Sequence, residues 1–311
     1  MLCPALVELP PPPPDKTGWP WTEQSPQLLD TLPDSSPWPR VSIVTPSYNQ
    51  GEFIEQTILS VLDQGYPNLE YIIMDGGSTD GTVEIIRGYE SHLAYWVSEP
   101  DEGQTQAINK GFRRCTGDLV AWQNSDDYYL PGAFEKIANA YEAREADVYF
   151  GHKYNVNRDG HIVRPMCYTP YSLRANVYEG SVIANQSAFW RRELFDRLGY
   201  LDESLDYAMD YEFFLRLGLN GCRFSLVNGF LGCYRAHEGS KSVYLHDNWP
   251  AEHARIDEKH HIKRPAKRIN KGLSLLRRTC HYLRQGNFHY ACQGLKRRLA
   301  LGMHATEPTV E

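Results

Sequence analysis

Two adjacent carboxylates, Asp126 and Asp127, follow a run that is typical of a buried strand. The run at 118–122 reads Asp-Leu-Val-Ala-Trp, and the Tyr-Tyr-Leu-Pro-Gly segment after the pair is typical of a turn that opens a helix. In open α/β sheets, ligands bind at the carboxyl ends of the strands, and paired carboxylates there suit a hard divalent cation that carries a phosphate. The alternative is that Asp127 caps the following helix while Asp126 is solvated.

Strand-like and helix-like runs alternate around this pair. The strand-like runs lie at 41–46, 69–75, 93–97 and 118–122, and helical patterns lie between them at 53–64, 83–89 and 103–114. Four successive βα units predict an α/β fold with a doubly wound, mostly parallel sheet and right-handed crossovers. The chain has 311 residues, 41% of them hydrophobic, which is enough for a sizeable core.

The loops that follow these strands are polar or acidic. They read Thr-Pro-Ser-Tyr-Asn at 45–49, Asp-Gly-Gly-Ser-Thr-Asp at 75–80, Asp-Glu-Gly at 101–103 and Asn-Ser-Asp-Asp at 124–127. Because the carboxyl ends of parallel strands meet at one edge of a sheet, we expect these loops to converge. This half has no Gly-x-x-x-x-Gly-Lys-Ser/Thr and no Gly-x-Gly-x-x-Gly, which argues against a nucleoside triphosphatase or a dinucleotide dehydrogenase. A metal ion would then neutralise the phosphates of a bound nucleotide.

Seven blocks between about residues 40 and 245 resemble the inverting family 2 glycosyltransferases, which have the Rossmann-like glycosyltransferase A fold. The blocks lie at 41–49, 75–82, 99–111, 122–127, 185–191, 210–216 and 234–237. The resemblance implies transfer of a sugar from a nucleoside-diphosphate sugar, with a UDP-sugar favoured, to an acceptor hydroxyl. The acceptor would belong to a glycan, a glycolipid or a cell-surface polysaccharide precursor, and the cofactor would be Mn²⁺ or Mg²⁺.

The resemblance assigns the donor site to the first blocks. Thr45, Pro46 and Ser47 would line the base and ribose together with Asp75, and Asp101 would close the same pocket. Further contacts to the nucleotide sugar are expected from the matched blocks at Asn49, Gly77, Gln104, Asn109, Asn124 and Ser125.

The metal motif of this family is Asp-x-Asp. Asp126 resembles its second acid, the one usually on the metal, whereas Asn124 stands in place of the first acid. An amide can still bind ribose hydroxyls or metal-bound water. Asp127 is a second candidate for the metal, because the sequence does not decide which carboxylate points inward.

His237 follows a strand-like run at 230–235. A lone histidine after a strand is usually a surface residue, but the resemblance makes it a further metal or diphosphate ligand. Arg235 or Lys241 could pair with the diphosphate.

Asp210 is the expected general base. It lies in the first turn of a predicted helix at 207–219, where the helix dipole favours the ionised carboxylate. The resemblance makes it the acid that takes the proton of the acceptor hydroxyl. Asp206 and Glu212 compete for this role.

The stretch between the acidic pair and the expected base should build the acceptor side. Asn-Arg-Asp-Gly at 157–160 predicts a hairpin. The tyrosine-containing stretch at 164–183 suits a flap over a sugar or an ordinary surface loop. The run at 185–190 predicts a strand.

Composition divides the chain into three parts. Residues 1–39 hold 11 of the 20 prolines and three of the seven tryptophans, which predicts a Pro-rich N-terminal arm, either a strap over the domain or a recognition segment. Residues 40–249 are the predicted catalytic domain, with a nucleotide-binding half at 40–127 and an acceptor half at 128–249. Residues 250–311 are expected to form a basic helical extension.

Charge is segregated along the chain. Residues 251–311 hold 13 Lys and Arg against 5 Asp and Glu, whereas residues 1–250 hold 19 against 34. An acidic body has the wrong sign to steer nucleic acid, so no nucleic-acid partner is expected. The basic segment could make peripheral contact with an anionic membrane, or it could pack on the acidic domain.

The sequence also indicates a location. No run approaches the roughly 18 apolar residues that span a bilayer, and the first residues lack the basic and apolar regions of a signal peptide. Seven cysteines without a Cys-x-x-Cys pair indicate reduced thiols rather than a disulfide frame or a zinc site. We therefore expect a cytoplasmic protein, with the basic segment as its contact to the inner membrane surface.

Two other classes of function stay open. A non-catalytic module that binds a nucleotide sugar or a glycan would keep these loops without turnover, and Asn124 is the feature that favours it. A nucleotidyltransferase would also bind nucleotide at acidic metal sites, but the basic Gly-rich first loop expected for a triphosphate is missing.

Overall fold

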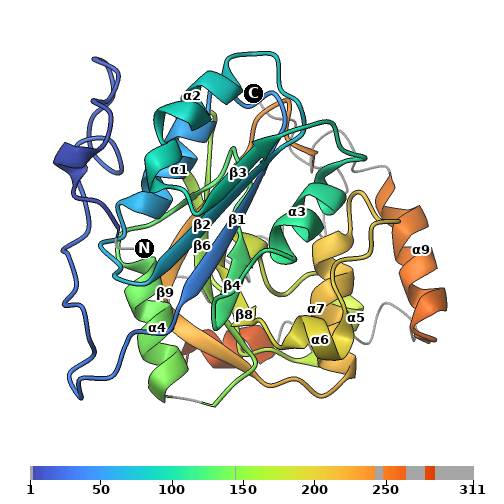
Figure 1. The fold of residues 1–311 in the computed structure, drawn as a ribbon. Coiled ribbons are helices and arrows are strands. Elements are labelled where there is room, and N and C mark those ends of the chain that lie inside the picture. The colour runs from blue at the N-terminus through green and yellow to red at the C-terminus, as the bar shows by residue number, and fades with distance from the viewer. Residues whose placement is uncertain (1–2, 144, 242–247, 264–276, 284–311) are drawn as a thin grey trace.

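The computed structural model of the chain describes residues 3–143, 145–241, 248–263 and 277–283. A mixed sheet runs through it in the strand order β3-β2-β1-β4-β8-β6-β9-β5, with β7 paired to β6 (Figure 1). The strands are β1 (Val41–Ser47), β2 (Leu69–Asp75), β3 (Tyr95–Ser98), β4 (Leu119–Trp122), β5 (Tyr128–Tyr129), β6 (Val148–Val156), β7 (Ile162–Met166), β8 (Ala188–Arg191) and β9 (Phe224–Arg235).

The first four strands form the parallel half of the sheet. β1 pairs with β2 and β4, and β2 pairs with β3, all in parallel. Every residue of β1, β2 and β4 is buried, as expected for strands with helices on both faces. The register sets Ser47 opposite Asp75 and Asp75 opposite Ser98, so the loops that follow these strands share one edge. The predicted doubly wound, mostly parallel α/β sheet is confirmed.

The second half of the sheet is mixed. β8 is antiparallel to β4 and β6, β9 is parallel to β6, and β5 is antiparallel to β9. The predicted hairpin is present between β6 and β7, with Gly160 at φ +87° in its turn. The strand predicted at 185–190 begins instead as a 3₁₀ turn, Asn185–Ser187, and only Ala188–Arg191 pairs with its neighbours.

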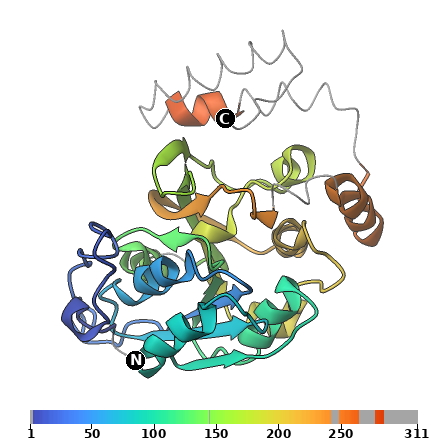
Figure 2. The ribbon, with the colours of Figure 1, turned by 90° about the horizontal axis from the view of Figure 1, so that it is seen from above.

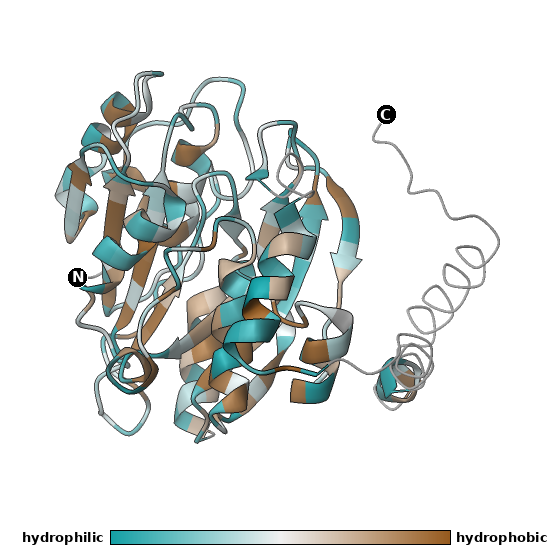
Figure 3. Ribbon diagram, turned by 90° about the vertical axis from the view of Figure 1, so that its right-hand side faces the viewer, coloured by the Kyte–Doolittle hydropathy of each residue, from teal (hydrophilic) through white to brown (hydrophobic). Residues whose placement is uncertain are grey.

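Helices cover both faces of the sheet. They are α1 (Ile54–Leu62), α2 (Thr82–Gly88), α3 (Gln104–Phe112), α4 (Ala133–Ala143), α5 (Leu173–Glu179), α6 (Leu194–Leu198), α7 (Met209–Leu219) and α9 (Trp249–Lys259), with 3₁₀ turns at Leu6–Glu8 and Glu90–His92. One apolar cluster holds the inner faces of α1 and α4, and a second holds those of α3, α6 and α7. Figure 3 shows the apolar residues gathered on the strands and the inner sides of the helices.

One helix lies where the sequence predicted a flap or a loop. α5 occupies part of the stretch 164–183, and the Ser172 hydroxyl accepts a hydrogen bond from the Ala175 N–H at its start. Ala175 and Val177 are buried in the same apolar cluster as α7. The helix forms because it is capped and can bury this small apolar face.

The N-terminal segment lies over the domain as a strap. Trp21 and Trp38 are buried in the cluster that contains α1 and α4. The indole N–H of Trp19 donates to the Tyr129 carbonyl at 2.8 Å, and that of Trp38 donates to the Leu29 carbonyl at 2.9 Å. Figure 1 shows this segment, in dark blue, along one side of the domain.

The predicted extension at 250–311 is described only in part. Its first residues belong to α9, and residues 277–283 are helical (Figure 2). The rest of that prediction, and most of the proposed membrane-contact surface, lies outside the described residues. Among the described helices, none is both long and apolar enough to span a membrane.

Candidate active site

A cavity of 820 Å³ lies at the carboxyl edge of the parallel strands. The loops after β1 to β4 line one side of it, and the start of α7 with the segment after β9 lines the other. Of the predicted site residues, those that line it are Pro46, Ser47, Gly77, Asp101, Gln104, Asn124, Ser125, Asp126 and Asp210. The fold therefore gathers around one cavity predicted site residues that lie up to 164 positions apart in the chain.

The loop after β2 is organised by Asp75. Its carboxylate accepts hydrogen bonds from the Gly77 N–H at 3.1 Å, the Ser78 N–H at 2.9 Å and the Ser98 hydroxyl at 2.6 Å. Asp75 is buried and lies outside the cavity lining. In the structure, the Asp75 carboxylate holds the backbone at Gly77, which does line the cavity. The contact of Asp75 itself with a nucleoside stays a prediction.

The neighbouring loops are tied to this one. The Asn49 side chain accepts from the Thr79 N–H at 2.9 Å, so Asn49 joins the loops after β1 and β2 instead of lining the cavity. A side chain at Gly76 would place its Cβ 2.7 Å from the Asp101 carboxylate, so the Asp101 side chain could keep its present position only while residue 76 is glycine. The predicted convergence of the loops is present.

The acidic loop after β4 is anchored from three elements. The Thr57 hydroxyl on α1 contacts the carbonyls of Ser125 and Asp127 at 2.9 and 2.6 Å. The Asp127 carboxylate accepts from the Gln186 amide at 2.8 Å and from the Arg235 N–H at 2.8 Å. These bonds fix the path of the loop through the acidic pair.

The two acids of the pair face different environments. Asp127 is fully buried, and its carboxylate is directed into the protein. Burial raises the pKa of Asp127 to about 7, and the neighbouring Asp126 adds to the rise. The Asp126 side chain, in contrast, lines the cavity and is 17% exposed. Asp126 is therefore the acid that can meet a ligand.

Asp126 is paired with the predicted histidine. The His237 Nε2 lies 3.0 Å from the Asp126 Oδ2, and the Phe53 ring packs against the imidazole with ring centres 4.7 Å apart. His237 does not line the cavity itself, but it contacts Asp126, which does. Within the described part of the chain, no group of three or more His, Cys, Asp or Glu side chains is arranged to hold a metal ion without help from a ligand.

A chain of hydrogen bonds joins side chains of the cavity wall to the buried Asp127. The Gln104 amide donates to the Asn124 oxygen at 2.9 Å, and the Asn124 amide donates to Asp127 at 3.0 Å. Gln186, which donates to Asp127, in turn accepts from the Lys153 ammonium at 3.2 Å. Asn124 thus serves as an acceptor and a donor at once, which a second ionised carboxylate at this position could not do.

Asp210 lies across the cavity, in the first turn of α7. Its carboxylate accepts from the Tyr211 N–H at 2.6 Å. Burial raises the pKa of Asp210, while the Tyr211 N–H and the charge of Lys153 oppose the rise. Burial also lowers the pKa of Lys153 to about 8, although Asp127 and Asp210 stabilise its charge.

Two residues predicted to contact the nucleotide sugar, Thr45 and Asn109, bind other protein groups in the structure. Thr45 is buried, and its hydroxyl lies 3.0 Å from the Tyr71 hydroxyl. The Asn109 amide donates to the Leu201 carbonyl at 2.9 Å and to the Glu203 carboxylate at 2.8 Å. Neither residue lines the cavity, because each side chain ties a strand or helix to its neighbour.

Of the two residues predicted to pair with the diphosphate, Lys241 lines the cavity and Arg235 does not. The Arg235 guanidinium donates to the Asp126 carbonyl at 2.9 Å and to the Gln56 side chain at 2.5 Å, so it is committed to the protein. Lys241 does line the cavity, where its ammonium donates to the Asp206 carbonyl at 3.2 Å.

The sequence did not single out Gln186 or Lys153. Gln186 lies in one of the matched blocks and lines the cavity, so the block itself was the available signal. Lys153 is one lysine in a strand, and only its three-dimensional neighbours distinguish it from a surface residue.

Comparisons with known proteins agree with this geometry. The sequence model of the family described as Glycosyl transferase family 2 matches residues 42–199. An uncharacterized glycosyltransferase of Mycobacterium tuberculosis is 33% identical over 184 residues, which cover 58% of this chain and 70% of the relative.

Two solved structures are similar in fold. S. aureus TarS 1-349 in complex with UDP-GlcNAc has a TM-score of 0.56 at 20% identity, covering 78% of this chain and 72% of that one. The mannosyltransferase PcManGT from Pyrobaculum calidifontis, in complex with GDP-Man and Mn²⁺, has a TM-score of 0.55 at 21% identity, covering 90% and 79%. At these identities the likeness shows the shared fold. With a family match over half its length and the predicted fold in place, the chain belongs to glycosyl transferase family 2 and is a glycosyltransferase.

Proposed function

We propose that this glycosyltransferase moves a sugar, with inversion, from a nucleoside-diphosphate sugar to an acceptor hydroxyl, and that it uses a bound Mn²⁺ or Mg²⁺. A UDP-sugar is the favoured donor. The observation that carries the proposal is that Asp126 and Asp210, from separate elements, line one cavity. One acid can serve the diphosphate and the other the incoming hydroxyl.

The donor side is proposed at the loops after β1 to β4. Ser47, Gly77 and Asp101 line the cavity where a nucleoside would lie, with Gln104 and Asn124 toward the sugar. TarS, which shares the fold, is described in complex with UDP-GlcNAc. This supports a nucleotide sugar as the ligand here, and the base and sugar are part of the proposal.

The metal is proposed at Asp126 and His237. A carboxylate and an imidazole 3.0 Å apart offer two of the ligands that a divalent cation needs, and a carboxylate suits Mg²⁺ and Mn²⁺. The structural neighbour PcManGT is described with GDP-Man and Mn²⁺. When bound, the ion would offset the negative charge that grows on the departing diphosphate. Asp127 is not proposed as a ligand, because its carboxylate is already occupied by Gln186, Asn124 and the Arg235 N–H.

The base is proposed to be Asp210. An acceptor hydroxyl has a pKa far above 7, so the carboxylate must take its proton as the oxygen attacks the anomeric carbon. Because burial raises the pKa of Asp210, the group is a stronger base than a solvated aspartate, provided that it is ionised. The nearby Lys153 favours the ionised form. Attack opposite the leaving diphosphate in a single displacement inverts the anomeric carbon.

The acceptor side is proposed at Gln186, Tyr207, Tyr234 and Lys241, which line the cavity opposite the donor loops. Amide and tyrosine side chains suit the hydroxyls and apolar faces of a sugar. We propose a hydroxyl of a glycan, a glycolipid or a cell-surface polysaccharide precursor as the acceptor.

The parts of the chain divide accordingly. We propose residues 40–127 as the nucleotide-binding half and 128–249 as the acceptor half, since both ranges contribute to the cavity. The arm at 1–39 and the extension at 250–311 flank them. A cytoplasmic location, with membrane contact through 251–311 and no nucleic-acid partner, completes the proposal.

The experiment compares Asp210→Asn with the wild type and with Asp206→Asn. Asp206 lines the same cavity but its side chain is 67% exposed, which makes it a matched control. Screening nucleoside-diphosphate sugars with Mn²⁺ for transfer or hydrolysis identifies a donor and separates an enzyme from a binding module. Asp210→Asn should then lower kcat by about 10²- to 10⁴-fold while donor affinity stays nearly unchanged. Wild-type turnover in Asp210→Asn would remove the base assignment.

A further inference from the structure

Helix α9 packs against the helix that carries Asp210. Ile256 on α9 is 1% exposed and lies in the same apolar cluster as Phe213 and Phe214 on α7. Both helices follow the segment 42–199 that the family model matches. The contacts between them therefore belong to a part of the chain that the family match does not describe.

Glu252 on α9 binds the turn that leads into α7. Its carboxylate accepts from the Ala208 N–H at 2.8 Å, from the Tyr207 N–H at 3.1 Å and from the Asp206 N–H at 3.2 Å. Ala208, the residue before α7, provides no side-chain cap of its own. Glu252 thus supplies, from 44 residues downstream, the anion that a helix N-terminus favours.

The cavity side of the same turn is held as well. The Lys241 ammonium donates to the Asp206 carbonyl at 3.2 Å. The backbone at Asp206 is therefore bound through its N–H by Glu252 and through its carbonyl by Lys241. The residues that Glu252 binds, 206 to 208, lie two to four positions before Asp210, so a shift of their backbone would displace the first turn of α7, which carries the Asp210 carboxylate.

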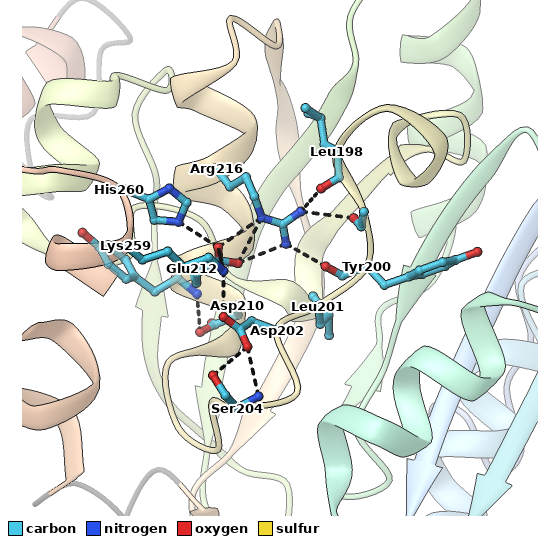
Figure 4. Close-up of polar contacts among 12 residues, drawn as sticks. Leu198, Tyr200, Leu201, Asp202, Ser204, Asp210, Glu212, Arg216, Lys259 and His260 are labelled. Atoms are coloured by element: carbon cyan, nitrogen blue, oxygen red, sulfur yellow. Dashed lines mark hydrogen bonds and ion pairs between the residues drawn. The ribbon is translucent and has the colours of Figure 1, made fainter. Parts of the chain in front are cut away.

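The other end of α9 binds Glu212, which lies in the first turn of α7. Glu212 is fully buried, and its carboxylate accepts from the Lys259 ammonium at 2.9 Å and lies 2.8 Å from the His260 Nε2 (Figure 4). Arg216 donates to the same carboxylate at 3.0 Å. Burial alone would raise the pKa of Glu212, but these three groups hold it below its ordinary value. Glu212 is thereby an ionised anchor for α9 and has no freedom to act as a base.

Aromatic contacts near the start of α9 add to these polar contacts. The Trp249 ring centre lies 5.5 Å from that of Tyr207 and 5.8 Å from that of Tyr211, and the His253 ring stacks on Tyr211 at 4.3 Å. Tyr207 also lines the cavity. Its ring therefore links α9 directly to the wall of the site.

We propose that α9 is a clamp on the base-bearing helix and that Glu252 is its positioning residue, fixing the turn that directs Asp210 into the cavity. This inference rests on the proposed function of Asp210. Glu252 does not touch the substrate, because it lies behind the turn. It acts on the acceptor step through backbone geometry. The donor side touches this segment through the Thr105 hydroxyl of α3, which donates to the Leu205 carbonyl at 2.9 Å, and Glu252 itself makes no contact with the donor loops.

The test compares Glu252→Ala and Glu252→Gln with the control Glu258→Ala, which removes an exposed glutamate from the same helix. Glu252→Ala should lower kcat by about 10- to 100-fold, because a shift of about 1 Å in a reacting group is worth that much. Donor affinity, measured calorimetrically with a nucleoside diphosphate and Mn²⁺, should change by less than about 3-fold. Glu252→Gln keeps one accepting oxygen and should lie between Glu252→Ala and the wild type, and Glu258→Ala should match the wild type.

The pH profile separates positioning from general destabilisation. kcat falls on the acid side as Asp210 takes up a proton. If the turn is loosened, water reaches the carboxylate, desolvation is relieved and the acid limb moves to lower pH in Glu252→Ala. A variant that merely unfolds more easily keeps the wild-type limb in its folded fraction.

Two results would overturn the clamp. One is a kcat in Glu252→Ala equal to that of the wild type, and the other is an equal loss of kcat and donor affinity with an unmoved acid limb. If Glu252→Ala fails to fold, the same comparison is made with Glu252→Gln, for which an unchanged kcat and acid limb would also overturn the clamp. Turnover in Asp210→Asn would sink the base assignment instead, whatever the Glu252 variants do.

Discussion

Replacing Asn124 with Asp restores the acid that the resemblance leads one to expect, and we predict that it destabilises this protein. The Asn124 amide nitrogen donates to the Asp127 carboxylate at 3.0 Å, and its oxygen accepts from Gln104 at 2.9 Å. In Asn124→Asp, the new carboxylate can still accept from Gln104, but it repels the carboxylate of Asp127. Asp127 is fully buried, so the repulsion is weakly screened.

The size of the effect follows from this geometry. Two like charges about 4 Å apart at an effective dielectric constant of about 20 repel by roughly 4 kcal/mol. The lost hydrogen bond to a carboxylate is worth about 1.5–3 kcal/mol. The two terms do not add fully, because the pair can retain one shared proton. We therefore expect the free energy of unfolding to fall by about 3–5 kcal/mol at pH 8 and by about 1 kcal/mol at pH 5.

The sign of the pH dependence can be worked out. The pKa of Asp127 is already raised to about 7 in the folded wild type, and a second carboxylate raises it further. The folded variant then binds more protons than its unfolded chain from about pH 4 to beyond pH 7, so its stability falls as the pH rises through that window.

Urea denaturation followed by tryptophan fluorescence at pH 5 and pH 8 measures these differences. Asn124→Ala is the control, since it removes the hydrogen bond without adding charge and should lose less stability than Asn124→Asp at pH 8, where Asp127 is ionised. The reasoning is refuted if Asn124→Asp is as stable as Asn124→Ala at pH 8, or if its loss is the same at both pH values.

Three further predictions concern single side chains. Asp126→Ala should weaken Mn²⁺ binding in the presence of a nucleoside diphosphate by more than about 10-fold, as measured by calorimetry, and unchanged affinity would move the metal elsewhere. The pKa of Asp63 is raised by burial to about 7, so wild-type stability falls as the pH rises from about 4 to 7. Asp63→Asn should therefore be more stable than the wild type at pH 8, by up to about 4 kcal/mol in urea denaturation, and equal stabilities at pH 8 would refute this. Gly111→Ala would place a Cβ 2.4 Å from a methyl carbon of Val44. The overpacking should cost about 1–3 kcal/mol and lower the urea midpoint of denaturation. An unchanged midpoint would show that the helix can shift freely.

The parallel half of the fold could be predicted because its signals are local. Each strand from β1 to β4 is a short apolar run, and each following helix has its own apolar stripe, so the alternation is visible in the sequence. The second half was less predictable. The pairing of β9 with β6 joins residues more than 70 positions apart. Helix α5 has only seven residues, and it depends on a small apolar face that packs in the same cluster as α7.

The candidate site divides in the same way. The edge at which the acids gather follows from parallel strand order, but which acid faces the cavity does not. Asp127 is directed inward by Gln186 and Arg235, which lie 59 and 108 residues away. Thr45 and Asn109 fall inside matched blocks, yet their side chains serve packing, since a motif fixes residue type without fixing direction. Glu252 gave no signal, because in sequence it is one acid on an amphipathic helix.

The partners that complete the acidic loop emerge late as a ribosome makes this chain. When Asp126 and Asp127 leave the exit tunnel, the strand that carries Arg235 has yet to be made, and β5 has no neighbour to pair with. Until then the Asp127 carboxylate lacks the Arg235 N–H from which it accepts a hydrogen bond in the folded chain. Because His237, the second residue of the proposed metal site, follows β9 in the sequence, that site cannot be complete before β9 has been made.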